Sequence, residues 1–330
     1  TGGEGTQTFD QFDPGQMRAK AIVDAATEGH DRWRTFTGEV EPVGVFEDCG
    51  ITVGGSSIRD HQGARRNRHA GQRDVLDQIL AAILARGHCL LVGVPGLAKT
   101  LMVSTLADIM TLSFKRIQFT PDLMPSDITG TEIIDQDAAT GSRSFRFVRG
   151  PVFANIVLAD EINRTPPKTQ AALLEAMEER QVSVDGQPRA LPDPFIVAAT
   201  QNPIEYEGTY QLPEAQLDRF LLKLNVPLPP RDQEIAILGR HAAGFDPRDL
   251  SAIRPVAGPA ELAAGREAVR QVLVADEVLG YIVDIVGATR NSPSLQLGVS
   301  PRGATALLGT ARSWAWLSGR NYVTPDDVKA

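Results

Sequence analysis

The sequence contains little cysteine and no apolar run long enough to cross a membrane. Cys49 and Cys89 are its two cysteines in 330 residues, so no disulfide framework is implied and a reducing compartment is expected. Arg86 and His88 interrupt the longest apolar candidate, so no stretch reaches membrane-spanning length. We therefore expect a cytoplasmic protein that is not inserted in a membrane.

Basic and aromatic residues are also scarce. Lys and Arg number 33 against 41 Asp and Glu, which gives a net charge of −8, and aromatic residues make up 6%. An acidic chain without clusters of aromatic and basic residues is a poor candidate for binding the backbone of a nucleic acid. Hydrophobic residues, in contrast, make up 42%, and a chain of this length and composition is expected to form two domains.

Residues 90–100 read as a strand, a glycine-rich turn and the start of a helix. Backbone N–H groups of such a turn, together with the helix N-terminus, can hold a polyphosphate. Lys99 would reach the β- and γ-phosphates, and the Thr100 hydroxyl would ligate Mg²⁺. Ala98 stands where the usual pattern has glycine, which is tolerable if this residue has a negative φ at the helix start. The alternative is an ordinary strand-to-helix turn.

Polar residues end two further apolar strands. Residues 156–159 run into Asp160 and Glu161, which are placed to hold Mg²⁺ through water and to orient an attacking water molecule. Residues 195–200 lead to Asn202, whose amide could position that water. The alternatives are an acidic strand-to-helix turn and a turn-capping asparagine.

The remaining pattern predicts an α/β core. Helices are expected near residues 74–84, 99–110, 166–179 and 213–220, strands at 114–119 and 221–226, and inserted hairpins near 131–149 and 181–194. In the helix over 166–179, Ala171, Leu174 and Met177 are expected on the apolar side.

The two ends of the chain differ from this core. Residues 1–66 show no legible pattern, whereas residues 229–330 show helical spacing and no convincing strand. We therefore expect an N-terminal segment over 1–66, an α/β core over 67–228, and a small all-α domain over 229–330 with Trp314 and Trp316 in its core.

From about Gly71 to Ala330 the chain resembles the MoxR family of AAA+ ATPases. The matching segments are GVPGLAKT (93–100), LADEINR (158–164), ATQNP (199–203), LPEAQLDRF (212–220) and SPR (300–302). Ala98 in place of glycine is itself typical of MoxR proteins. The resemblance implies a P-loop NTPase core with a parallel five-stranded sheet, two hairpin insertions and a C-terminal all-α lid.

The resemblance also implies a role for individual residues. Walker A comprises Lys99 and Thr100, Walker B comprises Asp160 and Glu161, Asn202 is sensor 1, Arg219 is the arginine finger and Arg302 is sensor 2. Contacts to the nucleotide are implied for Gly71, Gln72, Gly93, Val94, Pro95, Gly96, Leu97, Ala98, Lys99, Thr100 and Leu101. We expect Arg219 to complete a neighbour's site. Arg164 is the alternative finger, unless it forms a structural ion pair.

In this family, homohexameric rings use ATP and Mg²⁺ to remodel or assemble protein clients or to insert metals, often with partners that carry von Willebrand factor A domains. The hairpins usually face the pore of the ring. Two other hypotheses remain, an ATP-gated scaffold with negligible turnover and a nucleic-acid translocase. Residues 1–66 depart from the short helical lead-in of the family, and the end at Val328–Ala330 predicts a truncated lid.

Overall fold

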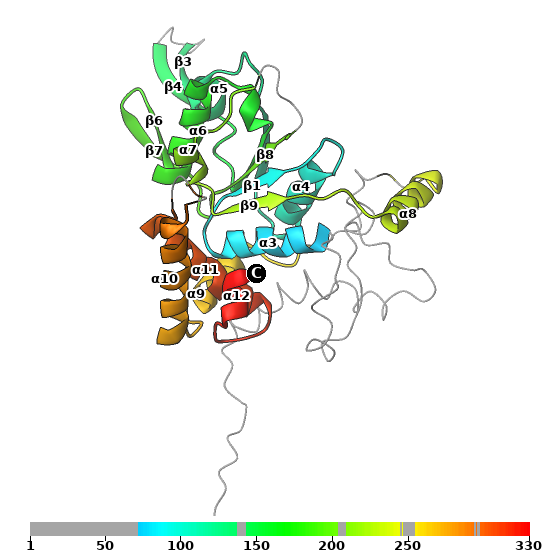
Figure 1. Cartoon of the computed structure of the whole chain (residues 1–330). Helices are drawn as coiled ribbons and strands as arrows, with labels where there is room; N and C mark the ends of the chain where they lie inside the picture. The colour runs from blue at the N-terminus through cyan, green and yellow to red at the C-terminus, as the bar shows by residue number, and fades with distance from the viewer. Residues whose placement is uncertain are drawn as a thin grey trace, which may run out of the picture.

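The computed structural model describes residues 72–136, 143–203, 209–244, 246, 255–293, 295 and 298–330. The expected segment over 1–66 and Gly71 lie outside these residues. The core is a parallel sheet of five strands in the order β2-β5-β8-β1-β9 (Figure 1), as expected. Its strands are β1 (Cys89–Val92), β2 (Phe114–Gln118), β5 (Ile156–Asp160), β8 (Ile196–Gln201) and β9 (Leu222–Asn225).

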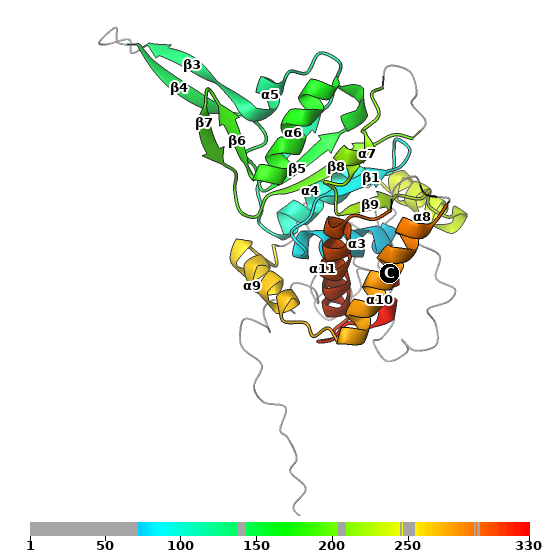
Figure 2. The same ribbon diagram turned by 60° about the vertical axis from the view of Figure 1, so that its left-hand side comes forward.

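Helices cover both faces of this sheet. Side chains that alternate along a strand, such as Leu90 and Leu91, enter different hydrophobic cores, as a strand buried on both sides requires. On one face pack α3 (Gln72–Leu84), α4 (Lys99–Ile109) and α9 (Pro259–Arg270). On the other face pack α5 (Pro125–Thr129) and α6 (Pro167–Glu179), as Figure 2 shows for α6.

Helix α6 buries a different stripe from the one expected. Leu174 and Met177 are buried, but Ala171 is exposed, and Leu173 is buried in its place. The buried stripe follows the i, i+3, i+4, i+7 spacing from Gln170, so Ala171 lies about 100° away from the start of that stripe.

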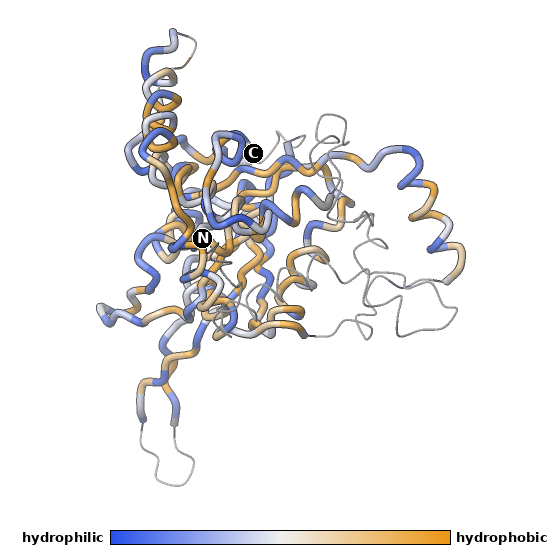
Figure 3. The backbone as a smooth tube through the Cα atoms, turned by 90° about the horizontal axis from the view of Figure 1, so that it is seen from below, coloured by the Kyte–Doolittle hydropathy of each residue, from blue (hydrophilic) through white to orange (hydrophobic). Residues whose placement is uncertain are grey.

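Both predicted hairpins are present, and they lie side by side (Figure 2). The first pairs β3 (Gly130–Gln136) with β4 (Arg143–Arg149), and the second pairs β6 (Gln181–Val184) with β7 (Gln187–Ala190). Asp185 and Gly186 join the latter strands with φ of 50° and 76°, as a tight Asp-Gly turn requires. The β3–β4 hairpin projects from the body of the molecule (Figure 3).

The C-terminal region is helical, as expected, and packs on α3. Its helices α10 (Asp276–Asn291), α11 (Pro301–Leu317) and α12 (Pro325–Lys329) share a core that includes Val272, Ile282 and Ala311. Trp314 and Trp316 are only half-buried, and Trp316 packs between this core and the core under the sheet.

Helix α8 (Arg231–Ala242) stands apart from this bundle (Figures 1 and 3), and none of its residues is buried. Among the described helices, none combines the length and apolar character that crossing a bilayer requires.

Arg266 of α9 fixes the helical region to the core. Its Nε and Nη2 donate hydrogen bonds to the Ile83 carbonyl at the end of α3, at 3.1 and 2.9 Å. Burial lowers the pKa of Arg266 to about 10, with the nearby Arg86 adding to the shift. The Ile83 carbonyl also accepts a hydrogen bond from the Arg86 N–H at 3.2 Å, so Arg266 adds charged donors to a carbonyl at the end of a helix.

Candidate functional site

The glycine-rich loop leaves the carboxyl end of β1 and leads directly into α4. Lys99, the first residue of α4, donates from Nζ to the carbonyls of Gly93 and Val94 at 2.6 and 2.9 Å. Burial lowers the pKa of Lys99, while Asp160 and Glu161 act in the opposite direction. The ammonium group therefore lies inside the loop and within electrostatic reach of both acids. A Cβ on Gly93 would meet the Val226 carbonyl at 3.0 Å, so the loop also uses glycine for close packing.

Ala98 does not have the negative φ on which its tolerance was expected to depend. Its φ of 54° and ψ of 24° lie in the left-handed region, immediately before α4. The chain needs this conformation to turn from the loop into the helix, which explains why glycine is usual here. In alanine the same conformation costs about 1 kcal/mol.

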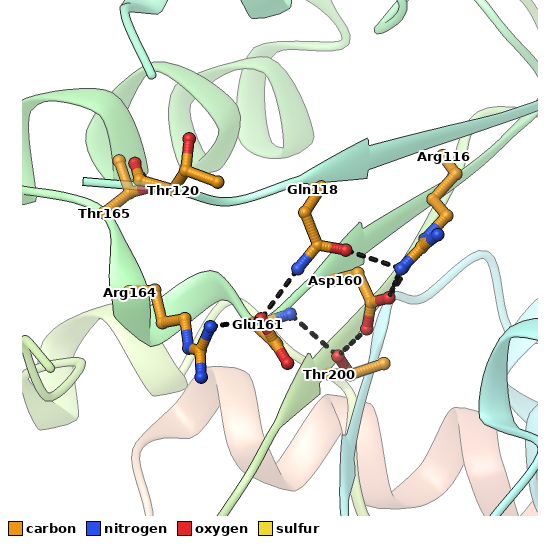
Figure 4. A network of polar contacts seen from close by, with 8 residues as sticks. All are labelled: Arg116, Gln118, Thr120, Asp160, Glu161, Arg164, Thr165 and Thr200. Atoms are coloured by element: carbon orange, nitrogen blue, oxygen red, sulfur yellow. Dashed lines mark hydrogen bonds and ion pairs between the residues drawn. The ribbon is translucent and has the colours of Figure 1, made fainter. Parts of the chain in front are cut away.

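Asp160 ends β5 and is almost fully buried. The Thr200 hydroxyl donates to Asp160 Oδ1 at 2.5 Å. Arg116 donates to Oδ2 from Nε at 3.0 Å and from Nη2 at 2.6 Å (Figure 4). These contacts orient the carboxylate, and the Arg116 guanidinium from the neighbouring strand balances its charge.

Glu161 follows in a left-handed conformation, with φ of 58°. Its Oε2 accepts a hydrogen bond from Gln118 Nε2 at 2.7 Å and forms an ion pair with Arg164 Nη1 at 3.2 Å (Figure 4). Its backbone N–H donates to the Thr200 hydroxyl at 2.9 Å. Arg164, the alternative arginine finger, is therefore paired within its own chain.

Sequence reasoning missed Arg116, Gln118 and Thr200. The first two point the same way from β2, and the register pairs Gln118 with Asp160 across the parallel ladder. The available signal was that Arg116 and Gln118 flank the buried Ile117, so that both polar side chains lie on the opposite face of the strand. The pattern could not show that β5 lies beside that strand.

The oxygen atoms at this edge of the sheet suit Mg²⁺. Magnesium usually takes one or two protein oxygens and completes its shell with water and phosphate. Thr100 and Asp160 offer a hydroxyl and a carboxylate of that kind. The described residues contain no cluster of three or more His, Cys, Asp or Glu side chains that would form an all-protein metal site. The donor set therefore fits a metal that is shared with a nucleotide.

Asn202 lies at the same edge of the sheet. It directly follows Gln201, which pairs with Val92, the last residue of β1, and its side chain is buried. The expected water-positioning amide and the phosphate loop therefore leave neighbouring strands at the same level. Gln72 is the first residue of α3, and Gly71 lies outside the described residues.

Arg219 and Arg302 lie at the opposite edge. Arg219 precedes β9, whose first residue Leu222 pairs with Cys89, the first residue of β1. Both arginines approach one carboxylate, that of Glu178 in α6, with Arg219 Nε at 3.1 Å and Arg302 Nη1 at 3.5 Å. The structure therefore brings Lys99, Asp160, Glu161 and Asn202 together and leaves these two arginines apart from them.

The sequence is similar to those of known proteins. Residues 88–222 match the sequence model of the ATPase family associated with various cellular activities (AAA), and residues 287–330 match that of the AAA lid domain. Protein YeaC of Bacillus subtilis is 51% identical over 259 residues, which cover 78% of this chain and 79% of YeaC. Chaperone MoxR1 of Mycobacterium tuberculosis is 45% identical over 78% of this chain and 68% of its own length. The chain belongs to the MoxR family of AAA+ ATPases.

More distant relatives agree. Protein MoxR of Paracoccus denitrificans is 32% identical over 86% of this chain and 88% of its own length. A crystal structure from Cytophaga hutchinsonii, described as a candidate ATPase, superposes with a TM-score of 0.73 at 35% identity over 95% of this chain and 86% of that one. Membership of the family identifies this MoxR protein as a nucleotide-binding ATPase with a helical lid.

Proposed function

We propose that this MoxR-family protein hydrolyses ATP with Mg²⁺ in a homohexameric, cytoplasmic ring that remodels or assembles protein clients or inserts metals into them. One observation carries the proposal. The phosphate loop and the acids lie at the carboxyl edge of the sheet, whereas Arg219 and Arg302 lie at the amino edge. One subunit therefore carries a phosphate site at one edge of its sheet and, at the other edge, the arginines that would complete the site of a neighbouring subunit.

At the carboxyl edge, each residue has a separate task. The loop amides and the Lys99 ammonium bind the β- and γ-phosphates. To reach them, Lys99 gives up its hydrogen bonds to the Gly93 and Val94 carbonyls. Thr100 and Asp160 would hold Mg²⁺, which offsets phosphate charge when bound. Asp160 would then have to release its ion pair with Arg116 in order to contact the hydrated metal ion.

Water activation falls to Glu161 and Asn202. The Glu161 carboxylate accepts a hydrogen bond from the attacking water and the Asn202 amide orients it, since phosphoryl transfer to water requires chiefly positioning and charge compensation. In the described state Glu161 is engaged by Gln118 and Arg164. Its release from these groups therefore precedes catalysis.

The arginine finger requires a neighbour. The four residues of β1 separate the two edges by about 13 Å, so Arg219 is badly placed for the phosphates bound in its own chain. In a ring, the amino edge of one subunit can face the loop of the next. Arg219, rather than Arg164, then completes the adjacent site.

The client is proposed to be a protein. Two hairpins are inserted in the core, and a net charge of −8 disfavours nucleic acid. By resemblance to the family, the partner would carry a von Willebrand factor A domain. Steady-state ATPase should therefore not respond to single-stranded nucleic acid.

The chemical roles can be tested by two substitutions. Lys99→Ala should weaken nucleotide binding, because it removes the cation that contacts phosphate. Glu161→Gln should retain binding and lose turnover by about 10²-fold or more, because it removes the group that activates water. Equilibrium binding of a fluorescent nucleotide and steady-state ATPase measure the two effects. Glu175→Gln, an exposed charge removal in α6, is the control. Hydrolysis at the parent rate by Glu161→Gln would refute the assignment.

A further inference from the structure

Glu178 belongs to none of the sequence motifs, yet it is the residue on which both distant arginines converge. It is the penultimate residue of α6. Arg219 approaches Oε2 through Nε at 3.1 Å, and Arg302 approaches Oε1 through Nη1 at 3.5 Å. Each carboxylate oxygen therefore serves one guanidinium.

The three side chains come from different parts of the chain. Arg219 lies between α7 (Glu214–Leu217) and β9, Arg302 is the second residue of α11, and 124 residues separate it from Glu178. Glu178 therefore links the ATPase core with the helical region. Exposed fractions of 29%, 41% and 52% for the side chains of Arg219, Glu178 and Arg302 leave the cluster open to an adjoining molecule.

Arg180 adds a positive charge close to the cluster. Arg180 follows Glu178 closely and donates to the Arg86 carbonyl at 3.3 Å. Burial lowers the pKa of the neighbouring His88 to about 4, and Arg180 and Arg302 add to this shift. Half-exposed arginines suit an anion such as a nucleoside triphosphate. Because Arg219 and Arg302 carry the same charge, they repel each other unless a carboxylate lies between them.

The geometry leaves the arginines able to act. The closest contact of Arg219 to Glu178 uses Nε, so an Nη edge of its guanidinium faces away from the carboxylate. A half-exposed ion pair is also weak enough to be exchanged for a phosphate group. The carboxylate can thus set the direction of both side chains without blocking them.

We propose that Glu178 is a positioning residue that holds Arg219 and Arg302 side by side at the subunit surface, so that both reach the γ-phosphate of the nucleotide bound by the next subunit. This inference rests on the proposed ring. It goes beyond that proposal by assigning the orientation of both arginines to Glu178.

Mixed assemblies test the inference because they separate the two halves of an interface. Arg219→Ala subunits retain a complete phosphate site, and Glu161→Gln subunits retain both arginines. Assemblies of the two should recover part of the ATPase activity that each lacks alone. Glu178→Gln is then added to one partner at a time, and kcat, KM and the composition of the assemblies are measured.

The expected result is asymmetric. In the Glu161→Gln partner, which supplies the arginines, Glu178→Gln should lower the recovered kcat about tenfold without changing KM, because a misplaced group costs less than the roughly 10³-fold lost with a whole arginine finger. In the Arg219→Ala partner, the same substitution should change nothing. Glu175→Gln, placed in α6 one turn earlier, should leave kcat unchanged in either partner.

Each other outcome overturns the inference in a recognisable way. Equal loss in both partners would assign Glu178 to folding or assembly, and a gain would mean that it restrains the arginines. Recovery that is insensitive to Glu178 would overturn its role alone. Absence of recovery by the parent pair in assemblies shown to be mixed would overturn action across the interface, and the proposed ring mechanism with it.

Discussion

At the scale of single residues, Ala98 has a strained backbone in the glycine-rich loop between β1 and α4. Its φ of 54° favours glycine, so Ala98→Gly should raise the free energy of unfolding by up to about 1 kcal/mol, the relief of strain being partly offset by the greater freedom of glycine in the unfolded chain. Urea unfolding without nucleotide measures the change.

A matched alanine should respond in the opposite direction. Ala171 is exposed in the interior of α6, so Ala171→Gly should lower the free energy of unfolding by about 1 kcal/mol. A decrease of similar size for Ala98→Gly would contradict the assignment of strain to Ala98.

At the scale of elements, His88 ties three of them together. It precedes β1. Its Nε2 lies 3.2 Å from the carbonyl oxygen of Met177 near the end of α6, and its Nδ1 accepts a hydrogen bond of 2.9 Å from the Val197 N–H of β8. This pattern requires a neutral ring with its proton on Nε2. Burial lowers the pKa of His88 from 6.5 to about 4, so protonation would break the bond to β8.

The consequence is a loss of stability in acid. Between pH 6.5 and 4 the unfolded chain binds a proton at His88 that the native chain does not, so the free energy of unfolding falls as pH falls, by about 2 kcal/mol at pH 5. Urea unfolding at pH 7 and pH 5 measures this slope. His88→Gln should be less stable at pH 7 but should lose about 2 kcal/mol less between the two pH values. An unchanged slope would show that other groups cause the acid sensitivity.

Elements were also the level at which the sequence was most informative. Apolar runs predicted all five strands within a few residues, because burial of a strand leaves a direct trace in the residue order. Both hairpins were predicted from β-favourable runs that flank a polar segment or the Asp185-Gly186 turn. The pattern did not predict that Arg116 would pair with Asp160 or that Glu178 would join Arg219 and Arg302. Such contacts depend on which strands are neighbours and on their register, which a single strand or helix does not encode. The conformation of Ala98 was missed because residue type alone suggested the helical region.

At the scale of the whole molecule, the two hairpins form one projecting unit. Arg189 of β7 forms an ion pair with Glu132 of β3 at 2.9 Å, and its guanidinium lies 4.0 Å from the centre of the Phe147 ring in β4. Further along the same face, the cross-strand pair Ile134 and Phe145 is 61% and 75% exposed. The base of the unit is therefore locked, while its outer part presents apolar side chains to another molecule.

This arrangement favours contact with a protein partner, since α6 joins the second hairpin to the strand that ends in Asp160 and could transmit nucleotide-dependent shifts. Replacing Asp185-Gly186-Gln187 with a short neutral linker should preserve basal ATPase and nucleotide affinity but abolish capture of, and stimulation by, a partner with a von Willebrand factor A domain. Pull-down and ATPase measurements follow both effects.

A second variant separates contact from ring building. Ile134→Ser combined with Phe145→Ser changes only exposed side chains, so it should fold and assemble as the parent does and yet capture less partner, because it removes apolar area that the partner would bury. Light scattering and native mass spectrometry report the assembly. If both hairpin variants lost assembly while monomers still captured the partner, the hairpins would hold neighbouring subunits together, and the partner would dock elsewhere on the ring.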